Sequence, residues 1–479
     1  MTDETTSLLP SNSADRQAEE TVDWHGPDDP QNALNWGEGR KWCHIVIMAF
    51  LTFLVPLGAT MFAPAVPQAV REFDIKSGVL SSLVLSIYIL GWMFGPLILG
   101  PASEIYGRLI VYTLTSISYV AFTVACALSP HVVFLVVFRF LAGCAGSAPL
   151  TLGGGTICDL VPVQERGLAL SLYMLGPVIG PSIGPLVGGY LAADWGWRSV
   201  FWVLAAAFGI TTLAQIIFMR ETYAPVLLAT KARHLQRVTG DASWRPKQDN
   251  GVDNSQLLQR AIARPAKLTL RSPINLLVSL ISAYVNGLLF LLVATMPIVL
   301  GKEYGFSPKG VGLAFEGIGV GNLVGLAVFV LTSDRYVKSR LRLGLLRPED
   351  RLPPVVAAAP MLAAGFLVYG WSAEQHVHWI VPILGTSLIG MGNILFFSSI
   401  IGYLIDAFPI HAASAVAANI IIRSLGGALL PLVGGPLYAT FGWGWGSSVL
   451  AFVALAFTPF LVLLYTRGET VRQKFQVEL

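Results

Sequence analysis

The sequence predicts an all-α membrane protein with twelve transmembrane helices in two pseudo-symmetric six-helix bundles. Its composition, the length of its apolar segments and a single long polar interruption all point to this fold. Of 479 residues, 54% are hydrophobic and only 12% are charged, and the mean hydropathy is +0.65. These polar side chains are too few to cover a soluble globule of this size, so lipid must solvate much of the chain.

The apolar residues fall into segments of about 20 residues or more, the length that a helix needs to cross about 30 Å of hydrocarbon. We expect helices at residues 44–66, 79–100, 109–128, 132–157, 167–191, 198–219, 273–300, 311–332, 354–373, 378–402, 413–439 and 447–466. The even number of spans predicts that both termini lie on one side of the membrane.

One polar and basic stretch divides these helices into two sets of six. It predicts an N-terminal tail at 1–43, a bundle at 44–219, a linker at 220–272, a second bundle at 273–466 and a C-terminal tail at 467–479. The halves also resemble each other, because the residues 103–106 after the second helix match 333–336 after the eighth. Such duplication is typical of alternating-access transporters, in which two similar bundles move around a site at the bilayer midplane.

Charge predicts the orientation. The great majority of the 31 Lys and Arg residues lie in the two tails, the linker and the loops on the same side, which predicts cytoplasmic termini. We therefore expect no nucleic-acid partner, because the basic residues lie where membrane insertion places them. No cleavable signal peptide is visible. The four cysteines show no CxxC spacing, so neither a disulfide framework nor a metal site is predicted.

The fifth predicted helix carries an unusual pattern of glycine and proline. The residues are Gly176, Pro177, Gly180, Pro181, Gly184, Pro185 and Gly188. Glycines four residues apart lie on one helical face and allow another helix to approach closely. The prolines remove backbone donors and bend the helix. The pattern predicts a gating helix, with a simple packing seam as the alternative.

A charged loop follows the second predicted helix. Glu104, Gly107 and Arg108 end the segment Gly100-Pro-Ala-Ser-Glu-Ile-Tyr-Gly-Arg108. A carboxylate and a guanidinium four residues apart at a helix end can form a charge-relay latch with neighbouring helices, which would hold the cytoplasmic side closed. The alternative is a loop that only directs membrane insertion.

Arg139 lies inside the fourth apolar segment, where a charge needs a partner. It could attract substrate or bias the protonation of a nearby carboxylate. The alternative is that its side chain extends to the extracellular surface.

Further polar residues lie within or beside the apolar segments. They are Asp159, Asn286, Glu316, Asn322, Asp334, Asn393, Asp406, Asn419 and Arg423. Glu316 is a candidate proton carrier, because an apolar environment favours a neutral carboxyl group; an interface glutamate that faces outside water is equally plausible. The four asparagines are candidates for substrate contact or proton coupling. Asp159 and Asp334 are expected in structural pairs at the cytoplasmic ends, and Asp406 and Arg423 could join the cytoplasmic ends of helices 10 and 11.

These motifs resemble those of the major facilitator superfamily. Residues 176–189 are similar to the Gly-Pro-rich fifth-helix motif of its antiporter branches, which implies export against protons. Residues 100–108 resemble G-x-L-x-D-R-x-G-R, with departures at Ala102, Glu104 and Ile105. The pattern Leu135-x3-Arg139-x3-Gly143 is similar to the fourth-helix motif.

Two other segments resemble the fungal twelve-helix drug:proton antiporters. Residues 24–36 are similar to W-x-G-P-x-D-P-x-N-P-x-N-W, with Ala33 in place of proline, and residues 221–233 are similar to E-T-Y-x-P-x-L-L…K-A-x. The resemblance covers residues 24–466. It implies a monomer that exports drugs, fungicides or secondary metabolites, driven by a proton gradient and without a cofactor.

Other functions fit less well. No phosphate-binding loop, zinc-protease motif or nucleophile elbow appears, so we do not expect an enzyme. A nutrient importer such as a sugar porter is one alternative, but sugar porters carry P-E-S-P-R after helix 6, where this chain has Arg220-Glu-Thr-Tyr-Ala-Pro225. A non-transporting sensor on the same fold is a further alternative. The plasma membrane is the expected location, with the vacuolar membrane as the alternative.

Overall fold

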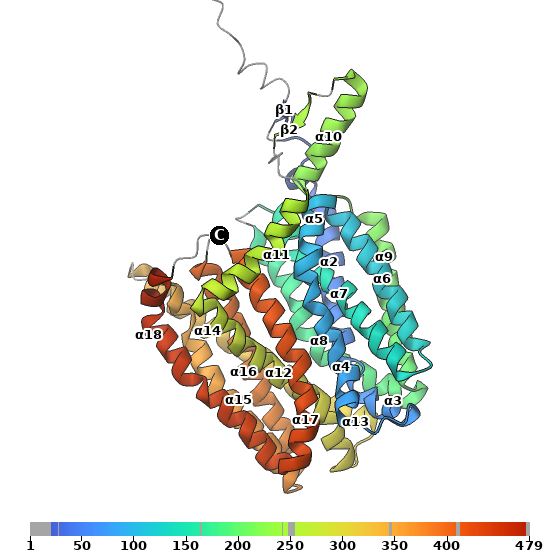
Figure 1. Ribbon diagram of the computed structural model, residues 1–479, viewed down its shortest axis with the longest axis vertical. Coiled ribbons are helices and arrows are strands. Elements are labelled where there is room, and N and C mark those ends of the chain that lie inside the picture. Colours follow the sequence, from blue (N-terminus) through green and yellow to red (C-terminus); the bar gives the residue numbers. More distant parts are fainter. Residues whose placement is uncertain are drawn as a thin grey trace, which may run out of the picture.

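A computed structural model describes residues 21–26, 28–162, 165–241, 243–247, 254–343, 347–408 and 412–475. Within α11 and α14 and near the start of α17, some of these residues are described by their backbone alone. Helices pack side by side through most of the molecule, and a small projection extends beyond one end (Figure 1).

The first half contains the helices of the first six predicted spans. They are α2 (Glu38–Thr60), η2 (Ala63–Ala65), α3 (Val66–Glu72), α4 (Gly78–Trp92), the π-helical η3 (Gly95–Leu99), α5 (Gly100–Tyr106), α6 (Arg108–Ala127), α7 (Val132–Leu160), α8 (Arg166–Trp195) and α9 (Trp197–Phe218). In this half α2 packs on α8 and α9, while α7 packs on α4 and α6. Elements α4, η3 and α5 follow one another directly and together form the second span.

The second half repeats the arrangement. Its elements are α12 (Pro273–Lys302), α13 (Pro308–Ala314), α14 (Glu316–Arg342), η4 (Pro348–Arg351), α15 (Pro353–Glu374), α16 (Ile380–Ala407), α17 (Ala412–Ala456) and α18 (Thr458–Lys474). Here α12 packs on α17, and α16 packs on α14 and α15. Several helices extend beyond their predicted ends, because charged residues outside the apolar core are good helix formers.

The last two predicted spans are joined into one long helical stretch in the structure. The described residues contain eleven helical stretches apolar and long enough to cross a membrane, and the last, Ser414–Lys474, has 61 residues. That is more than twice the length that one crossing requires. At Gly442 the backbone leaves the helical region, with φ 72° and ψ 176°, and joins two helices across a kink. Twelve crossings therefore fit the observed helices.

The segment between the halves is partly helical rather than an irregular linker. It contains α10 (Ala224–Thr239), the short strand β2 (Arg245–Pro246) and α11 (Asn254–Arg271). Strand β1 (Thr21–Val22) of the tail pairs in parallel with β2, and η1 (Ala33–Asn35) precedes α2. Helix α10 projects from the bundle beside this small sheet, while α11 runs across the end of the bundle (Figure 1).

We call the end of the bundle that carries α10 and α11 the linker side, and the opposite end, with α3 and α13, the far side (Figure 1). On the linker side α11 contacts α5 and η3 of the first half and α12 and α17 of the second. The halves also meet directly, through α8 against α13 and α14 and through α4 against α12 and α17. These meeting surfaces contain the candidate site.

Candidate transport site between the two halves

The glycine face of α8 packs against α2 of the same half. A Cβ atom on Gly176 or Gly180 would lie within 3 Å of backbone atoms of Phe53, and one on Gly188 would lie 1.8 Å from the Met61 carbonyl oxygen. A Cβ on Gly184 would lie 2.4 Å from Thr60 Oγ1. Only glycine permits this approach of the two backbones. The predicted close-packing face is therefore present, and the structure identifies its partner.

A different face of α8 meets the second half. A Cβ on Gly189 would lie 2.4 Å from the Pro308 carbonyl oxygen, so α8 and α13 are in backbone contact. Beside this contact, Lys309 Nζ lies 2.7 Å from Asp194 Oδ1, and its ammonium group lies over the ring of Tyr190. The proline-containing helix therefore touches both halves, and its far-side end is tied to the opposite half.

Helix α4 forms the second contact between the halves. The rings of Trp92 on α4 and Phe290 on α12 meet edge to face, with centroids 6.4 Å apart. A Cβ on Gly427 of α17 would lie 3.2 Å from Ile89 on α4 and 2.5 Å from Asn286 Nδ2. Motif and charge patterns did not single out Trp92 or Phe290, because an aromatic residue in an apolar helix gives no distinguishing signal.

Glu316 lies at the start of α14, where this helix approaches α8. A Cβ on Gly319 would lie 2.9 Å from Ser182 Oγ and 3.1 Å from Glu316 Oε2, so both side chains reach the same small region. Glu316 Oε1 and Ser182 Oγ are buried and have no hydrogen-bond partner among the described residues. The residue as a whole is only half-buried, and no ion pair with a described residue holds its carboxyl group.

The four candidate asparagines differ in their partners. Asn286 Nδ2 donates to the Arg423 carbonyl oxygen over 3.0 Å, and Asn419 Nδ2 donates to Ser282 Oγ over 2.9 Å. These bonds join α12 to α17. By contrast, the Oδ1 atoms of Asn322 and Asn393 are buried and have no donor among the described residues. The first pair therefore has a structural role in the described state, whereas the second pair has unused acceptors.

Arg139 is enclosed by aromatic rings. Its guanidinium carbon lies 5.0 Å from the ring centroid of Phe62, 5.3 Å from that of Tyr88 and 5.6 Å from that of Phe201. The residue is 1% exposed, so the predicted extension to the surface is wrong. No carboxylate of the described chain pairs with it, and Nε and Nη2 lack hydrogen-bond partners there. The faces of the rings supply the negative potential that the cation needs.

Arg108 forms the predicted contact with a neighbouring helix on the linker side. Its Nε lies 3.3 Å from Asp159 Oδ2 at the end of α7, and its Nη1 donates to Ser103 Oγ over 2.7 Å. The guanidinium group also lies over the ring of Tyr223. We call Arg108, Asp159, Ser103 and Tyr223 the first-half latch. Glu104, which we expected in it, is exposed, and within the described ranges no ion pair or hydrogen bond holds its carboxylate.

Glu221 is a residue of this latch region that sequence reasoning missed. Its carboxylate accepts hydrogen bonds from the backbone N–H groups of Arg108 and Leu109 at the start of α6, each over 3.0 Å. It also accepts from the N–H groups of Thr222 and Tyr223. A carboxylate at a helix N-terminus is favourable for the helix dipole. Glu221 belongs to the segment that resembles E-T-Y-x-P, but the resemblance gave no role for it.

Gly107 permits the close approach of Glu221. Its φ of 97° is unfavourable for other residues, and a Cβ there would lie 2.4 Å from Glu221 Oε2. The position of this glycine in the loop could be predicted from the sequence, but only the structure shows that it makes room for the Glu221 carboxylate.

The second half has a corresponding ion pair with a different partner from the one predicted. Asp406 Oδ2 lies 2.9 Å from Nε of Arg351, the last residue of η4 before α15, and not beside Arg423. Arg423 instead lies over the ring of Phe397 at 4.9 Å. The expected tie between Asp406 and Arg423 is therefore wrong, because Asp406 lies at the end of α16 whereas Arg423 lies about three helical turns after the start of α17. The Asp334 side chain lies outside the described residues.

The tail and the linker form a clasp, made of Asp23, Trp24, Asp29, Lys231 and Lys247. Asp29 accepts hydrogen bonds from the backbone N–H groups of His25 and Gln31, both over 2.9 Å, and lies 3.4 Å from Lys231 Nζ. These N–H groups, with Lys231, hold the pKa of Asp29 below its ordinary value. Lys247 pairs with Asp23 at 2.5 Å. The aspartate-containing motif before α2 therefore positions α10.

The fold and this site define a membrane transporter built from two similar helical halves. The family model of the Major Facilitator Superfamily matches residues 48–431. The chain belongs to this superfamily, and it is a transporter rather than an enzyme.

Fungal relatives resemble the chain over nearly its whole length. The MFS-type transporter hepF of Aspergillus oryzae is 45% identical over 472 residues, which is 97% of each protein. The MFS-type transporter penM of Penicillium rubens is 49% identical and covers 95% of this chain and 90% of its own. The efflux pump radE of Floropilus chiversii is 43% identical and covers 100% of this chain and 90% of its own.

Solved structures share the fold. The xylose transporter XylE from E. coli, in a partially occluded inward-open conformation, has a TM-score of 0.67 and 15% identity, over 90% of this chain and 98% of that one. A bacterial homologue of the lysosomal transporter Spinster has a TM-score of 0.63 and 13% identity, over 92% and 100%.

Proposed function

We propose that the protein is a proton-driven exporter of small organic compounds such as drugs, fungicides or secondary metabolites. Substrate binds between the two halves and is released on the far side as protons move toward the linker side. Membership of the superfamily, the helix-5 motif and the name of the radE efflux pump support this proposal.

The observation that carries the proposal is the position of Glu316. Its carboxyl group lies on the second half, faces the Ser182 region of the first half, and has a buried oxygen without a partner among the described residues. The two halves meet at this surface in one state of the cycle and separate in another. A carboxyl group there is therefore alternately in apolar and in aqueous surroundings. It therefore binds a proton in one state and releases it in the other.

The unused acceptors suggest the chemistry of the substrate. Asn322 Oδ1 and Asn393 Oδ1 are buried without a donor within the described part of the chain, and Trp92 Nε1 is a buried donor without an acceptor there. A largely apolar compound with a few hydroxyl, amide or carbonyl groups would satisfy these atoms. We expect the asparagines to bind such groups rather than to carry protons.

The proposed orientation places the linker side in the cytoplasm, because most basic residues of the sequence belong to that side. In the described state the far-side ends of the halves are held together by Lys309 and Asp194. Export requires this contact to open. We propose the plasma membrane as the location and the monomer as the functional unit.

Efflux from intact cells tests the function. Cells that produce the protein are loaded with a panel of labelled drugs and metabolites, and export is followed with and without a protonophore. We expect export that the protonophore abolishes, and at least a tenfold loss in Glu316→Gln, which cannot release a proton.

Two matched variants separate charge from folding. Glu316→Asp retains the carboxyl group and should retain part of the export. In Glu303→Gln the amide oxygen can still accept from Trp443 Nε1, as Glu303 Oε1 does over 3.3 Å, so export should stay near normal. Export that ignores the protonophore, or an unaffected Glu316→Gln variant, would contradict proton coupling through this residue.

A further inference from the structure

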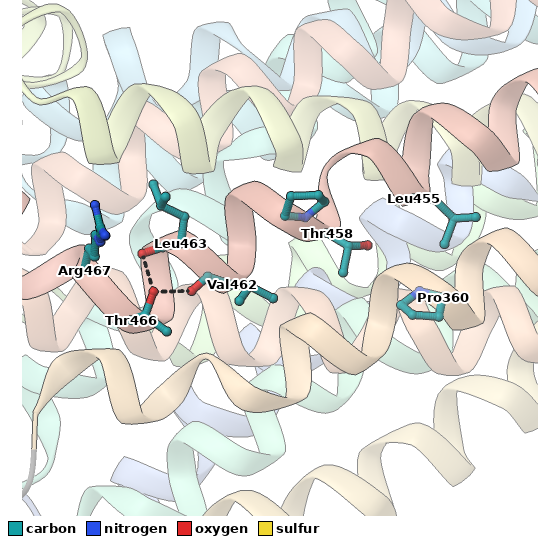
Figure 2. Close-up of a pocket in the computed structure, with 8 residues that line it drawn as sticks. Pro360, Leu455, Thr458, Val462, Leu463, Thr466 and Arg467 are labelled. Atoms are coloured by element: carbon teal, nitrogen blue, oxygen red, sulfur yellow. Dashed lines mark hydrogen bonds between the residues drawn. The ribbon is translucent and has the colours of Figure 1, made fainter.

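A long groove lies on the outer surface of the second half, away from the surfaces where the halves meet. Helix α15 and the segment from the end of α17 into α18 line this open groove, which has a volume of about 760 Å³. Figure 2 shows Pro360 on one side and Leu455, Val462, Leu463 and Arg467 along the other. The groove is therefore distinct from the proposed transport site.

Local sequence explains why the two helices leave space here. At Phe457, between α17 and α18, the backbone stays in the helical region, with φ −77° and ψ −19°, but Pro459 has no N–H group to donate to the Leu455 carbonyl oxygen. Opposite this point α15 presents Pro360, whose ring is compact. The compact side chains of Pro360, Thr458 and Pro459 leave a channel that neighbouring helices of the described chain do not fill.

The length of the groove is close to the thickness of one lipid leaflet. From Leu455 to Arg467 the helix rises about 18 Å, at about 1.5 Å per residue. Half of the hydrocarbon core of a bilayer is about 15 Å thick. Because helix twelve begins after Gly442 on the far side and ends at Lys474, Leu455 lies near mid-membrane and Arg467 near the linker-side interface.

Charge is found only at the interfacial end of this lining. Arg467 is exposed and lines the groove, and no ion pair or hydrogen bond to another described residue holds its guanidinium group. The neighbouring Arg472 is different, because its Nε lies 3.4 Å from Glu349 Oε1. Thr466, also in the lining, uses its hydroxyl to donate to the carbonyl oxygens of Val462 and Leu463, as the dashed lines in Figure 2 show.

We propose that this groove binds one phospholipid of the linker-side leaflet. An acyl chain lies along Leu455, Val462 and Leu463, and the phosphate group accepts hydrogen bonds from Arg467. The planar guanidinium group of arginine can donate two hydrogen bonds to the oxygens of one phosphate group. At the membrane interface these hydrogen bonds are partly shielded from water. The apolar lining and the single free cation fit a phospholipid better than a sterol, which has no phosphate, or a second copy of the chain.

Lipid retention tests the proposal without reference to transport. The full chain is purified in detergent, incubated with phosphatidylcholine or with the diacylglycerol that carries the same acyl chains, washed, and examined by native mass spectrometry. We expect one phosphatidylcholine to remain bound per chain, and at least fivefold weaker retention of diacylglycerol. Arg467→Gln should abolish this preference for the lipid that carries phosphate.

A groove-filling variant tests the acyl-chain part. Val462→Trp places a large ring in the groove and should reduce retention of phosphatidylcholine at least tenfold. Val453→Trp is the matched control, because Val453 is 39% exposed and Val462 41%, but only Val462 lines the groove.

Three results would overturn the proposal. They are equal retention of the two lipids by the unmodified protein, retention by Val462→Trp equal to that by Val453→Trp, and a dimer that forms in place of lipid binding and is lost in Val462→Trp. Thermal unfolding of each variant shows whether it is folded, so loss of lipid is distinguished from loss of structure.

Discussion

The linker-side ends of the two halves carry the same kind of ion pair in different surroundings. In the first half, the Arg108 and Asp159 side chains are 13% and 20% exposed, and Ser103 and Tyr223 complete the latch. In the second half, Arg351 and Asp406 are 30% and 37% exposed. Duplication therefore preserved the pair between the third and fourth helices of each half, while the burial that makes such a pair strong differs between the halves.

The largest expected effect comes from breaking the first-half pair. Arg108→Gln leaves Asp159 partly buried without its cation, and losing a hydrogen bond to a charged group costs about 1.5–3 kcal/mol. We expect export to fall about tenfold or more, since 1.4 kcal/mol corresponds to a factor of ten. The measurement is initial efflux rate at equal surface expression.

Arg351→Gln is the matched change in the second half. An exposed pair is worth about 0.2–1 kcal/mol, so export should fall about fivefold at most. Equal losses in the two variants would show that burial does not distinguish the two pairs.

An intermediate effect is expected from the helix cap that the first half possesses. Glu221→Ala removes the acceptor for the backbone N–H groups at the start of α6. Loss of a side-chain cap costs about 0.5–2 kcal/mol, so the unfolding temperature should fall by a few degrees. Thermal unfolding in detergent, followed by intrinsic fluorescence, measures this.

Glu104→Ala is the control on the same loop. Its carboxylate has no ion pair or hydrogen bond in the described structure, so its unfolding temperature should stay within about one degree of normal. A drop as large as that of Glu221→Ala would mean that the Glu104 carboxylate has a partner in another conformational state, which the protein populates more than the described one.

The smallest effect is expected at the clasp between the N-terminal tail and the linker, which has no counterpart among the described residues of the second half. Hydrogen bonds hold the pKa of Asp29 below its ordinary value, so its contribution is complete above the unfolded pKa of about 3.9 and is lost as the pH falls through the lower folded pKa. Hydrogen exchange of residues 23–36, corrected for intrinsic rates, should therefore accelerate below about pH 4.

Asp29→Asn should show faster exchange already at pH 7 and no further change from this group on acidification. Exchange in the unmodified protein that is independent of pH down to about pH 2 would contradict the assignment of the clasp to the ionised carboxylate.

Much of this arrangement could be predicted from the sequence, because helix spans depend on apolar length alone. The glycine face of α8 was also predictable, because glycines four residues apart lie on the same face of a helix. Partners were not. Arg108 could be predicted to form a latch, but Asp159 and Glu221 are 51 and 113 residues away in the chain. Spacing within a helix contains no information about which distant helix end lies beside it.

Arg139 shows a second kind of limit. Its position predicted a need for a partner, and carboxylates are the usual partners. The structure surrounds it with Phe62, Tyr88 and Phe201 instead. Aromatic residues are so common in apolar helices that no pattern distinguishes three rings around a cation from ordinary core packing.

Proton-driven export is most directly tested in proteoliposomes that contain the purified protein, an exported compound and a pH-sensitive dye. An imposed proton gradient, with the membrane potential held at zero, should drive the compound opposite to proton flow, and the dye should report proton movement that requires the compound. Glu316→Gln should show neither movement. Transport of the compound in the same direction as protons, or at the same rate without a gradient, would contradict the account.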